Sequence, residues 1–162
     1  MTLLHPGDRF PTFTVPLSDG GTLVLPDDLT ESFGVVLFYR GAWCPYCNAQ
    51  LSAFQRAAES LADVGAKIVA LSVDDEATTR ELIAKHHLAF PVGHSADAHR
   101  IAAATGAFVN DDPTYLQSTG FLLDPEGRVV VSVYSSGAIG RLVAEDVVGL
   151  IRYLCQHTAA SV

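Results

Sequence analysis

The chain has 162 residues, of which 49% are hydrophobic and 17% charged, so it can bury a core as one domain and is neither disordered nor fibrous. Ten Lys and Arg against 18 Asp and Glu give a formal net charge of −8, which argues against a nucleic-acid partner because phosphate binding needs clustered basic residues. No apolar run reaches the roughly 20 residues of a membrane span, and residues 1–10 lack a secretory-signal pattern. We therefore expect one cytoplasmic domain over residues 1–162, with no membrane association.

Hydrophobic patterning predicts alternating strands and helices. Turn-forming residues at 18–21 lie between two predicted strands, and together these segments predict a β-hairpin. The unbroken apolar run Val35–Tyr39 is typical of a strand covered on both faces. A helix follows from Pro45, with apolar residues spaced by three and four, and it ends at Gly65. The other predicted elements are strands at 13–17, 22–25, 67–73, 90–93, 120–123 and 129–134, and helices at 75–88, 98–105 and 144–157.

These elements predict an α/β fold with an N-terminal β-hairpin and a mixed central β-sheet flanked by helices. The strand, helix and strand between Val35 and Val73 form a right-handed unit whose two strands are parallel. The last hairpin contributes antiparallel strands to the same sheet.

Cys44 and Cys47 form a Cys-x-x-Cys motif between a buried strand and the start of its helix. In open α/β sheets, chemistry collects beyond the carboxyl ends of the strands. The positive end of a helix dipole stabilises a thiolate, and Arg40 adds a positive charge four residues before Cys44. Residues three apart on a helix have Cβ atoms about 5–6 Å apart, close to the separation that a disulfide needs. The motif therefore predicts a redox site with a reversible Cys44–Cys47 bond.

The two thiols differ in their predicted environments. Cys47 opens the apolar stripe of its helix and is expected to be buried, whereas Cys44 precedes the first turn and is expected to be more exposed. A pair of packed cysteines and a structural zinc site are the alternatives, but neither the six histidines nor Cys155 lies at a short metal-ligand spacing from the pair. No cofactor is expected. Cys155, in the last helix, is predicted to be packed or idle, with a resolving or intersubunit thiol as the alternative.

Five short segments, each weak alone, occur in a specific order and spacing. They are Gly7–Phe13, Val36–Tyr39, Ile68–Asp74, Phe90–Val92 with Ser95 and Asp97, and Gly120–Gly127. In that order they resemble the peroxiredoxin-like members of the alkyl hydroperoxide reductase and thiol-specific antioxidant family, which have a thioredoxin-like fold. The resemblance covers nearly the whole chain and implies a thiol-dependent peroxidase. In this family one cysteine attacks hydrogen peroxide or an organic hydroperoxide, becomes a sulfenic acid, and is rescued by a second thiol as a disulfide. That attacking cysteine falls on Cys47, so the resemblance implies that Cys44 resolves.

Three positions depart from the family pattern. The family has Pro where this chain has Arg40, and a Thr or Ser where it has Cys44. The family's Arg before its late strand falls on Ser118, and residues 109–127 contain no Lys or Arg. Arg40 is the candidate replacement for that missing cation. The predicted catalytic residues are therefore Cys47, Cys44 and Arg40.

The tetrapeptide Cys44-Pro45-Tyr46-Cys47 also resembles the active site of glutaredoxins, and Trp43 before it resembles thioredoxin. In those proteins the first cysteine attacks, which here is Cys44. They also carry a cis-Pro before the late strand, which residues 117–120 lack. A thioredoxin- or glutaredoxin-like disulfide reductase and a non-catalytic redox sensor therefore remain alternatives. The peroxidase reading implies a hydroperoxide substrate and a thioredoxin-like, glutaredoxin-like or low-molecular-weight thiol reductant, with homodimers as a common assembly.

Overall fold

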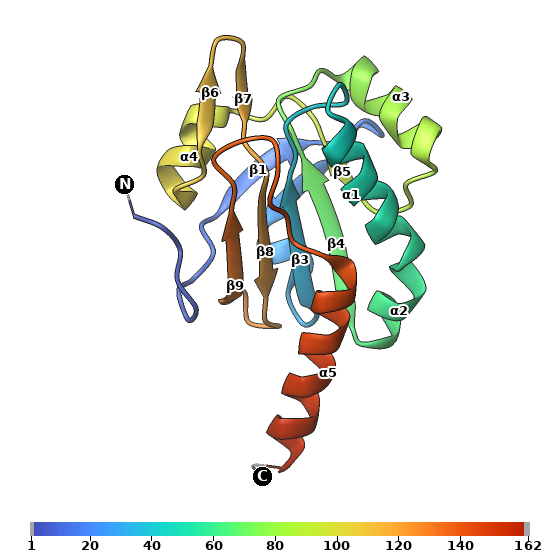
Figure 1. Cartoon of the computed structure of the whole chain (residues 1–162), viewed down its shortest axis with the longest axis vertical. Helices are drawn as coiled ribbons and strands as arrows, with labels where there is room; N and C mark the ends of the chain where they lie inside the picture. Colours follow the sequence, from blue (N-terminus) through green and yellow to red (C-terminus); the bar gives the residue numbers. More distant parts are fainter. Residues whose placement is uncertain (1, 161–162) are drawn as a thin grey trace.

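A five-stranded sheet forms the centre of the computed structural model, which describes residues 2–160 (Figure 1). The first three strands in the order are parallel to one another, and the last two form an antiparallel hairpin beside them. The predicted mixed sheet is therefore confirmed. Its order is β5 (Val92–Gly93), β4 (Ala66–Leu71), β3 (Phe33–Phe38), β8 (Thr119–Leu123) and β9 (Val129–Tyr134).

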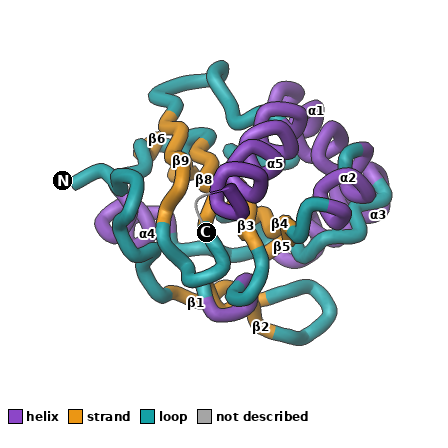
Figure 2. Tube along the Cα trace, turned by 90° about the horizontal axis from the view of Figure 1, so that it is seen from below, coloured by secondary structure: helices purple, strands orange, loops and turns teal. Residues whose placement is uncertain are grey.

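Both faces of the sheet are covered (Figure 2). On one face lie α1 (Pro45–Arg56), α2 (Ala58–Asp63), α3 (Glu76–His86) and α5 (Ala144–Ala160). On the other face lie α4 (Ala98–Thr105) and the predicted N-terminal hairpin of β1 (Phe13–Pro16) and β2 (Thr22–Leu25).

Strand β3 contributes to the hydrophobic cores on both faces. Val35 and Leu37 belong to the core under α1, whereas Val36 and Phe38 belong to the core under the hairpin. All four side chains are fully buried, which explains why the strand shows no alternation between apolar and polar residues.

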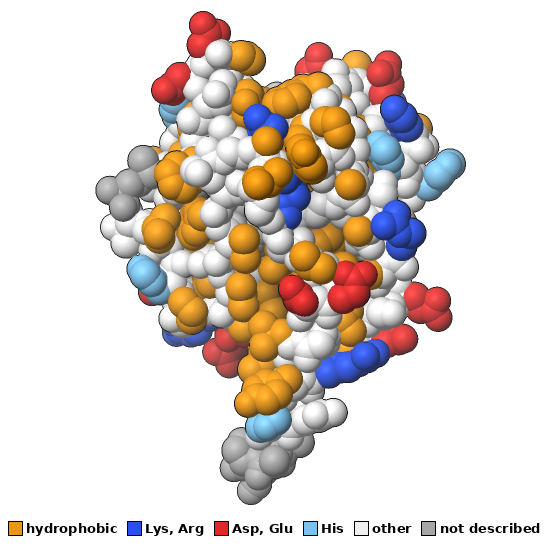
Figure 3. All heavy atoms as spheres, viewed as in Figure 1, with side chains coloured by type: hydrophobic (Ala, Val, Ile, Leu, Met, Phe, Trp, Pro, Cys, Tyr) orange, Lys and Arg blue, Asp and Glu red, His pale blue; other side chains and the backbone are white. Residues whose placement is uncertain are grey.

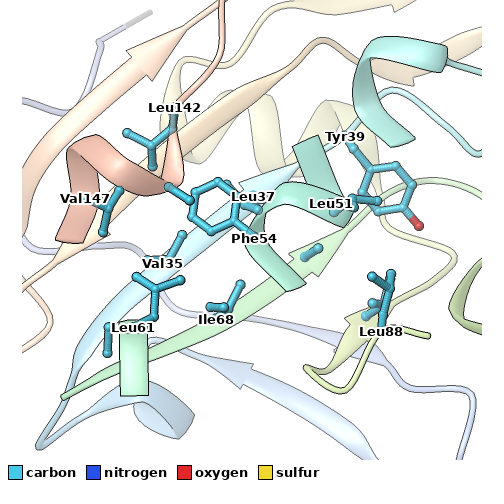
Figure 4. Packing of buried hydrophobic residues seen from close by; sticks show 14 of the residues in the cluster. Val35, Leu37, Tyr39, Leu51, Phe54, Leu61, Ile68, Leu88, Leu142 and Val147 are labelled. Atoms are coloured by element: carbon cyan, nitrogen blue, oxygen red, sulfur yellow. The ribbon is translucent and has the colours of Figure 1, made fainter. Parts of the chain in front are cut away.

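Helix α1 is anchored by the apolar stripe that its spacing predicts. Cys47, Leu51 and Phe54 lie on one face of the helix and are fully buried. Figure 4 shows Phe54 near Leu142 and Leu37, between the sheet and the start of α5. Because a Phe→Ala change in such a core costs about 3–5 kcal/mol, this packing fixes the orientation of α1 and of its first turn.

The helix predicted over 45–64 is in fact two helices. Ala57 separates α1 from α2, and its N–H bonds to the carbonyls of both Ala53 and Gln55. Neither Gly nor Pro marks this break, so the apolar spacing continues across it without a signal. Three further elements were not predicted: a 3-10 helix at Asp27–Leu29 and a hairpin of β6 (Val109–Asp111) and β7 (Thr114–Leu116). Within residues 2–160, no helix is both long and apolar enough to span a membrane.

Candidate active site

The Cys-x-x-Cys motif lies just beyond the carboxyl end of β3, at the first turn of α1. Cys44 is the N-cap residue, and its Sγ accepts the backbone N–H of Cys47 at 3.3 Å. The first amides of a helix have no partner within the helix, so a sulfur at this position replaces the usual cap oxygen. Pro45 follows at the first helical position, where its missing N–H costs nothing.

A partly buried carboxylate holds the turn that leads into the motif. Asp74, beyond the end of β4, accepts the N–H of Ala42 at 2.8 Å, and Asn48 of α1 donates to the Ala42 carbonyl at 3.0 Å. Burial raises the pKa of the Asp74 carboxyl. Asp75 caps α3 by accepting the N–H of Thr78. The turn is therefore tied to both neighbouring elements.

Both thiols of the motif are free and completely buried, at 0% exposure. The prediction that Cys44 is the more exposed thiol is wrong, because its side chain turns back over the helix N-terminus to cap it. Cys155, predicted to be packed or idle, is not packed, since that thiol is exposed on α5. Across residues 2–160, no group of three or more His, Cys, Asp or Glu side chains is arranged to hold a metal ion.

The structure brings Arg40 to both sulfurs, through different atoms. Its backbone N–H donates to Sγ of Cys47 at 3.3 Å. Its side-chain Nη1 lies 3.7 Å from Sγ of Cys44. The guanidinium also donates to Oε1 of Gln117 and to the hydroxyl of Tyr115, each at 3.0 Å. The positive charge of Arg40 is thus directed at Cys44.

A second arginine, Arg141, contacts the pair and was missed by sequence reasoning. It lies in the segment between β9 and α5, and its Nη2 is 3.1 Å from Sγ of Cys47 and 3.6 Å from Sγ of Cys44. Gln50 of α1 donates to the carbonyl of Leu142 at 3.0 Å and so holds this segment against the helix. The signal in the sequence was weak: Arg141 is the single Lys or Arg between Arg128 and Arg152.

The two thiols ionise unequally. Burial opposes the thiolate at Cys44, but hydrogen bonds from the thiol and backbone amide of Cys47 and from Arg40 outweigh it, so the pKa of Cys44 lies below its ordinary value. Burial, followed by the hydrogen bond to Cys44, raises the pKa of Cys47 above its ordinary value. The first proton to leave the pair at rest therefore comes from Cys44.

Aromatic rings surround the two guanidinium groups. Trp43 and Tyr46 are each 55% exposed and lie at the rim of the site. The Cζ atom of Arg40 lies 4.8 Å from the centre of the Trp43 ring, and that of Arg141 lies 5.7 Å from the centre of the Tyr46 ring. Figure 3 shows basic side chains surrounded by hydrophobic ones in the upper middle of this face.

We expect Arg40→Met to raise the pKa of Cys44, because the guanidinium favours its thiolate. The change is best measured in a Cys47→Ser background, which leaves Cys44 as the one thiol of the motif, by following ultraviolet thiolate absorbance against pH. Arg56→Met, at the far end of α1, is the matched control. An unchanged titration curve would mean that the helix N-terminus and Arg141 stabilise this thiolate without Arg40.

Comparison with known proteins identifies the family. The profile of the AhpC/TSA family matches residues 6–132. A peroxiredoxin of Methanothermobacter thermautotrophicus is 30% identical over 152 residues, which cover 90% of this chain and 71% of that protein. Alkyl hydroperoxide reductase C of Mycolicibacterium smegmatis is 27% identical over 163 residues, which cover 90% of this chain and 82% of that protein.

Solved structures agree with the sequence matches. Peroxidoxin BcpB from Mycobacterium tuberculosis superposes with a TM-score of 0.79 at 20% identity, over 93% of this chain and 97% of that one. A peroxiredoxin-like protein from Aquifex aeolicus superposes with a TM-score of 0.80 at 16% identity, over 95% and 90%. The predicted thioredoxin-like fold is confirmed. The chain therefore belongs to the AhpC/TSA family and is a peroxiredoxin-like, thiol-dependent peroxidase.

Proposed function

We propose that the protein reduces small hydroperoxides with Cys47 as the attacking thiol and Cys44 as the resolving thiol. The observation that carries this assignment is the pair of donors on Sγ of Cys47, the Arg40 backbone N–H at 3.3 Å and Nη2 of Arg141 at 3.1 Å. Donors fixed at a sulfur stabilise its thiolate, and they also lie close to the oxygens of a peroxide that approaches it.

The two thiols alone supply the two electrons that reduce the hydroperoxide. The Cys44 thiolate takes the proton of Cys47, and the resulting Cys47 thiolate attacks the peroxide oxygen that carries hydrogen. The O–O bond breaks, the leaving oxygen takes the proton from Cys44 and departs as water or an alcohol, and Cys47 becomes a sulfenic acid. The Cys44 thiolate then attacks Sγ of Cys47, an S–S bond forms, and hydroxide leaves. Two electrons from the thiols have reduced one hydroperoxide.

Burial of the pair favours peroxide reduction over the reduction of protein disulfides. Neither sulfur is accessible, and guanidinium groups of Arg40 and Arg141 contact Cys44. A protein disulfide reaches Cys44 only after both side chains move, whereas a peroxide needs a much smaller opening. A groove of about 320 Å³, lined in part by Tyr46, Ile139 and Arg141, lies beside the site and is a candidate approach for a peroxide.

We expect one equivalent of hydrogen peroxide to convert the protein to an intramolecular Cys44–Cys47 disulfide, because the resolving thiol is already hydrogen-bonded to the attacking one. Peptide mapping under non-reducing conditions, after alkylation of free thiols, identifies the bond. Exposed Cys155 is an internal control and should be fully alkylated. Cys155 in the dominant disulfide, or a covalent dimer, would contradict the assignment.

Regeneration requires a thiol reductant, for which we propose a thioredoxin-like or glutaredoxin-like protein or a low-molecular-weight thiol. A reducing compartment keeps a Cys-x-x-Cys pair in its dithiol form, which supports the cytoplasm as the site of action. Peroxide turnover with thioredoxin, with glutaredoxin and glutathione, and with dithiothreitol distinguishes the donors. A redox sensor would react once and fail to turn over with all three. Sedimentation of the reduced and oxidised protein tests for the homodimers that the family resemblance implies.

A further inference from the structure

Neutral groups hold the side chain of Arg40 on several sides. Its Nε donates to Oε1 of Gln117 and its Nη2 to the hydroxyl of Tyr115, each at 3.0 Å. Its Cζ lies 4.8 Å from the centre of the Trp43 ring and 5.1 Å from that of the Tyr115 ring. The remaining nitrogen, Nη1, faces Sγ of Cys44 at 3.7 Å. The guanidinium is therefore fixed with one nitrogen toward one sulfur.

The groups that hold Arg40 are neutral, so they leave its positive charge uncompensated. Within residues 2–160, no carboxylate forms an ion pair with it. A carboxylate in place of Gln117 or Tyr115 would cancel much of the guanidinium's field at the sulfur, whereas an amide and a phenol orient the group without cancelling it. Gln117 is only 8% exposed, so its amide oxygen is an acceptor withdrawn from water.

The side chains of the two arginines contact the two sulfurs unequally. The side chain of Arg40 contacts Cys44, whereas Nη2 of Arg141 is closer to Cys47, at 3.1 Å, than to Cys44, at 3.6 Å. We propose that Tyr115 and Gln117 are positioning residues, which fix Arg40 on Cys44 and so accelerate the second chemical step, formation of the disulfide. This inference rests on the proposed function, in which Cys47 attacks and Cys44 resolves.

A slower second step has a distinct chemical consequence. In that step the Cys44 thiolate attacks Sγ of Cys47, the S–O bond breaks, and the departing hydroxide takes a proton from solvent. The competing reaction is oxidation of the Cys47 sulfenic acid to a sulfinic acid by a second hydroperoxide, which is itself reduced to water or an alcohol. Whatever weakens the hold on Arg40 should lengthen the life of the sulfenic acid and increase the yield of sulfinic acid.

The first test compares Tyr115→Phe, which keeps the ring and loses the hydroxyl, with Gln117→Met, which keeps the length and loses the acceptor. Each protein is mixed rapidly with hydrogen peroxide, quenched with a thiol-alkylating reagent and analysed by mass. We expect each change to slow disulfide formation about three- to tenfold, the effect of one lost hydrogen bond. The first step should slow less than the second, because Cys47 keeps its own donors, the Arg40 backbone N–H and Nη2 of Arg141. The peroxide concentration that gives half-maximal sulfinic acid should fall in proportion. Tyr153→Phe, at an exposed position of α5, is the matched control.

A second test separates positioning with a neutral group from a structural role. Gln117→Glu keeps an oxygen acceptor for Nε of Arg40 but adds a negative charge beside the guanidinium. We expect it to slow disulfide formation at least as much as Gln117→Met does, with thermal stability close to that of the wild type. A purely structural role for Gln117 predicts instead a wild-type rate for Gln117→Glu.

The outcomes distinguish this inference from the proposed function. Unchanged rates of disulfide formation in Tyr115→Phe and Gln117→Met, with the sulfenic acid on Cys47, would overturn the positioning role and leave the proposed function intact. A slower first step in these variants, with the sulfenic acid on Cys44, would overturn the assignment of attacker and resolver and the positioning role with it. Peptide mapping of the trapped sulfenic acid decides which thiol carries it.

Discussion

Cys47→Ser is expected to abolish the fast reaction with hydrogen peroxide, lowering its rate by about a thousandfold or more, since a serine hydroxyl is not a nucleophile of comparable strength. Cys44→Ser is expected to consume one equivalent of peroxide and to accumulate Cys47 as a sulfenic or sulfinic acid, because no resolving thiol remains. The single Trp, Trp43, immediately precedes the motif, so its fluorescence in a stopped-flow experiment reports the first step. Cys155→Ser, which changes the exposed thiol, is the matched control.

This pair of variants is decisive because two observations point to different thiols. The family match and the donors on Sγ of Cys47 favour Cys47 as the attacker, whereas the lowered pKa of Cys44 favours a resting charge there. Proton exchange between hydrogen-bonded thiols is fast, so the resting charge does not by itself choose the nucleophile. If Cys47→Ser reacts at the wild-type rate and Cys44→Ser is inert, Cys44 is the nucleophile and the disulfide-reductase reading replaces the assignment to Cys47.

Arg141→Met is expected to slow the attack on hydrogen peroxide by about a hundredfold, the usual effect of removing one donor from a site where charge develops. Its Nη2 is the donor 3.1 Å from Sγ of Cys47, and contacts with the Ala138 carbonyl and the Tyr46 ring hold it there. Arg141→Lys should recover only part of the rate, because an ammonium keeps the charge without the planar geometry. Arg152→Met, at an exposed position of α5, is the matched control.

The pH dependence of Arg141→Met separates two contributions of this side chain. A guanidinium stabilises the thiolate, so its loss raises the apparent pKa of the thiol pair and moves the rise of the rate with pH to higher pH. At alkaline pH the thiolate forms without Arg141, and the part of the rate that returns is the share due to ionisation. The deficit that persists is the share due to contact with the peroxide in the transition state. A wild-type rate profile in Arg141→Met would contradict both roles.

Arg141 lies outside the part of the chain that matches the family profile. The family profile ends at residue 132, before the segment that carries Arg141. By the resemblance to the family, the arginine expected before the late strand falls on Ser118. In this protein the cation closest to Cys47 comes from the segment between β9 and α5, and a second cation, Arg40, comes from the β3–α1 turn. Arg141 therefore joins Arg40, the replacement that the sequence suggested, as a candidate for the role of that arginine.

Local sequence determined the scaffold of the site. The unbroken apolar run of β3, the cysteine motif after it and the apolar spacing of α1 predicted that Cys44 and Cys47 stand at a strand-to-helix corner, where the structure places them. Turn formers at 18–21 likewise predicted the first hairpin, and the strands predicted at 120–123 and 129–134 form the last one. Such patterns are readable because each reports the burial of one element's own faces, which repeats every two or 3.6 residues.

Only the tertiary structure decided which side chains meet at the sulfurs. Antiparallel pairing sets Phe38 of β3 opposite Thr119 of β8, so Gln117 arrives beside Arg40 from 77 residues away. Thr119 also pairs with Tyr134 of β9, so the segment carrying Arg141 leaves the sheet at the same end of the strands. Arg141 thus reaches Cys47, 94 residues earlier in the sequence. The burial of Cys44 follows from its capping bond and from these two arginines. Periodicity within a segment carries no information about such contacts, because they depend on strand order and on loops with no repeat of their own.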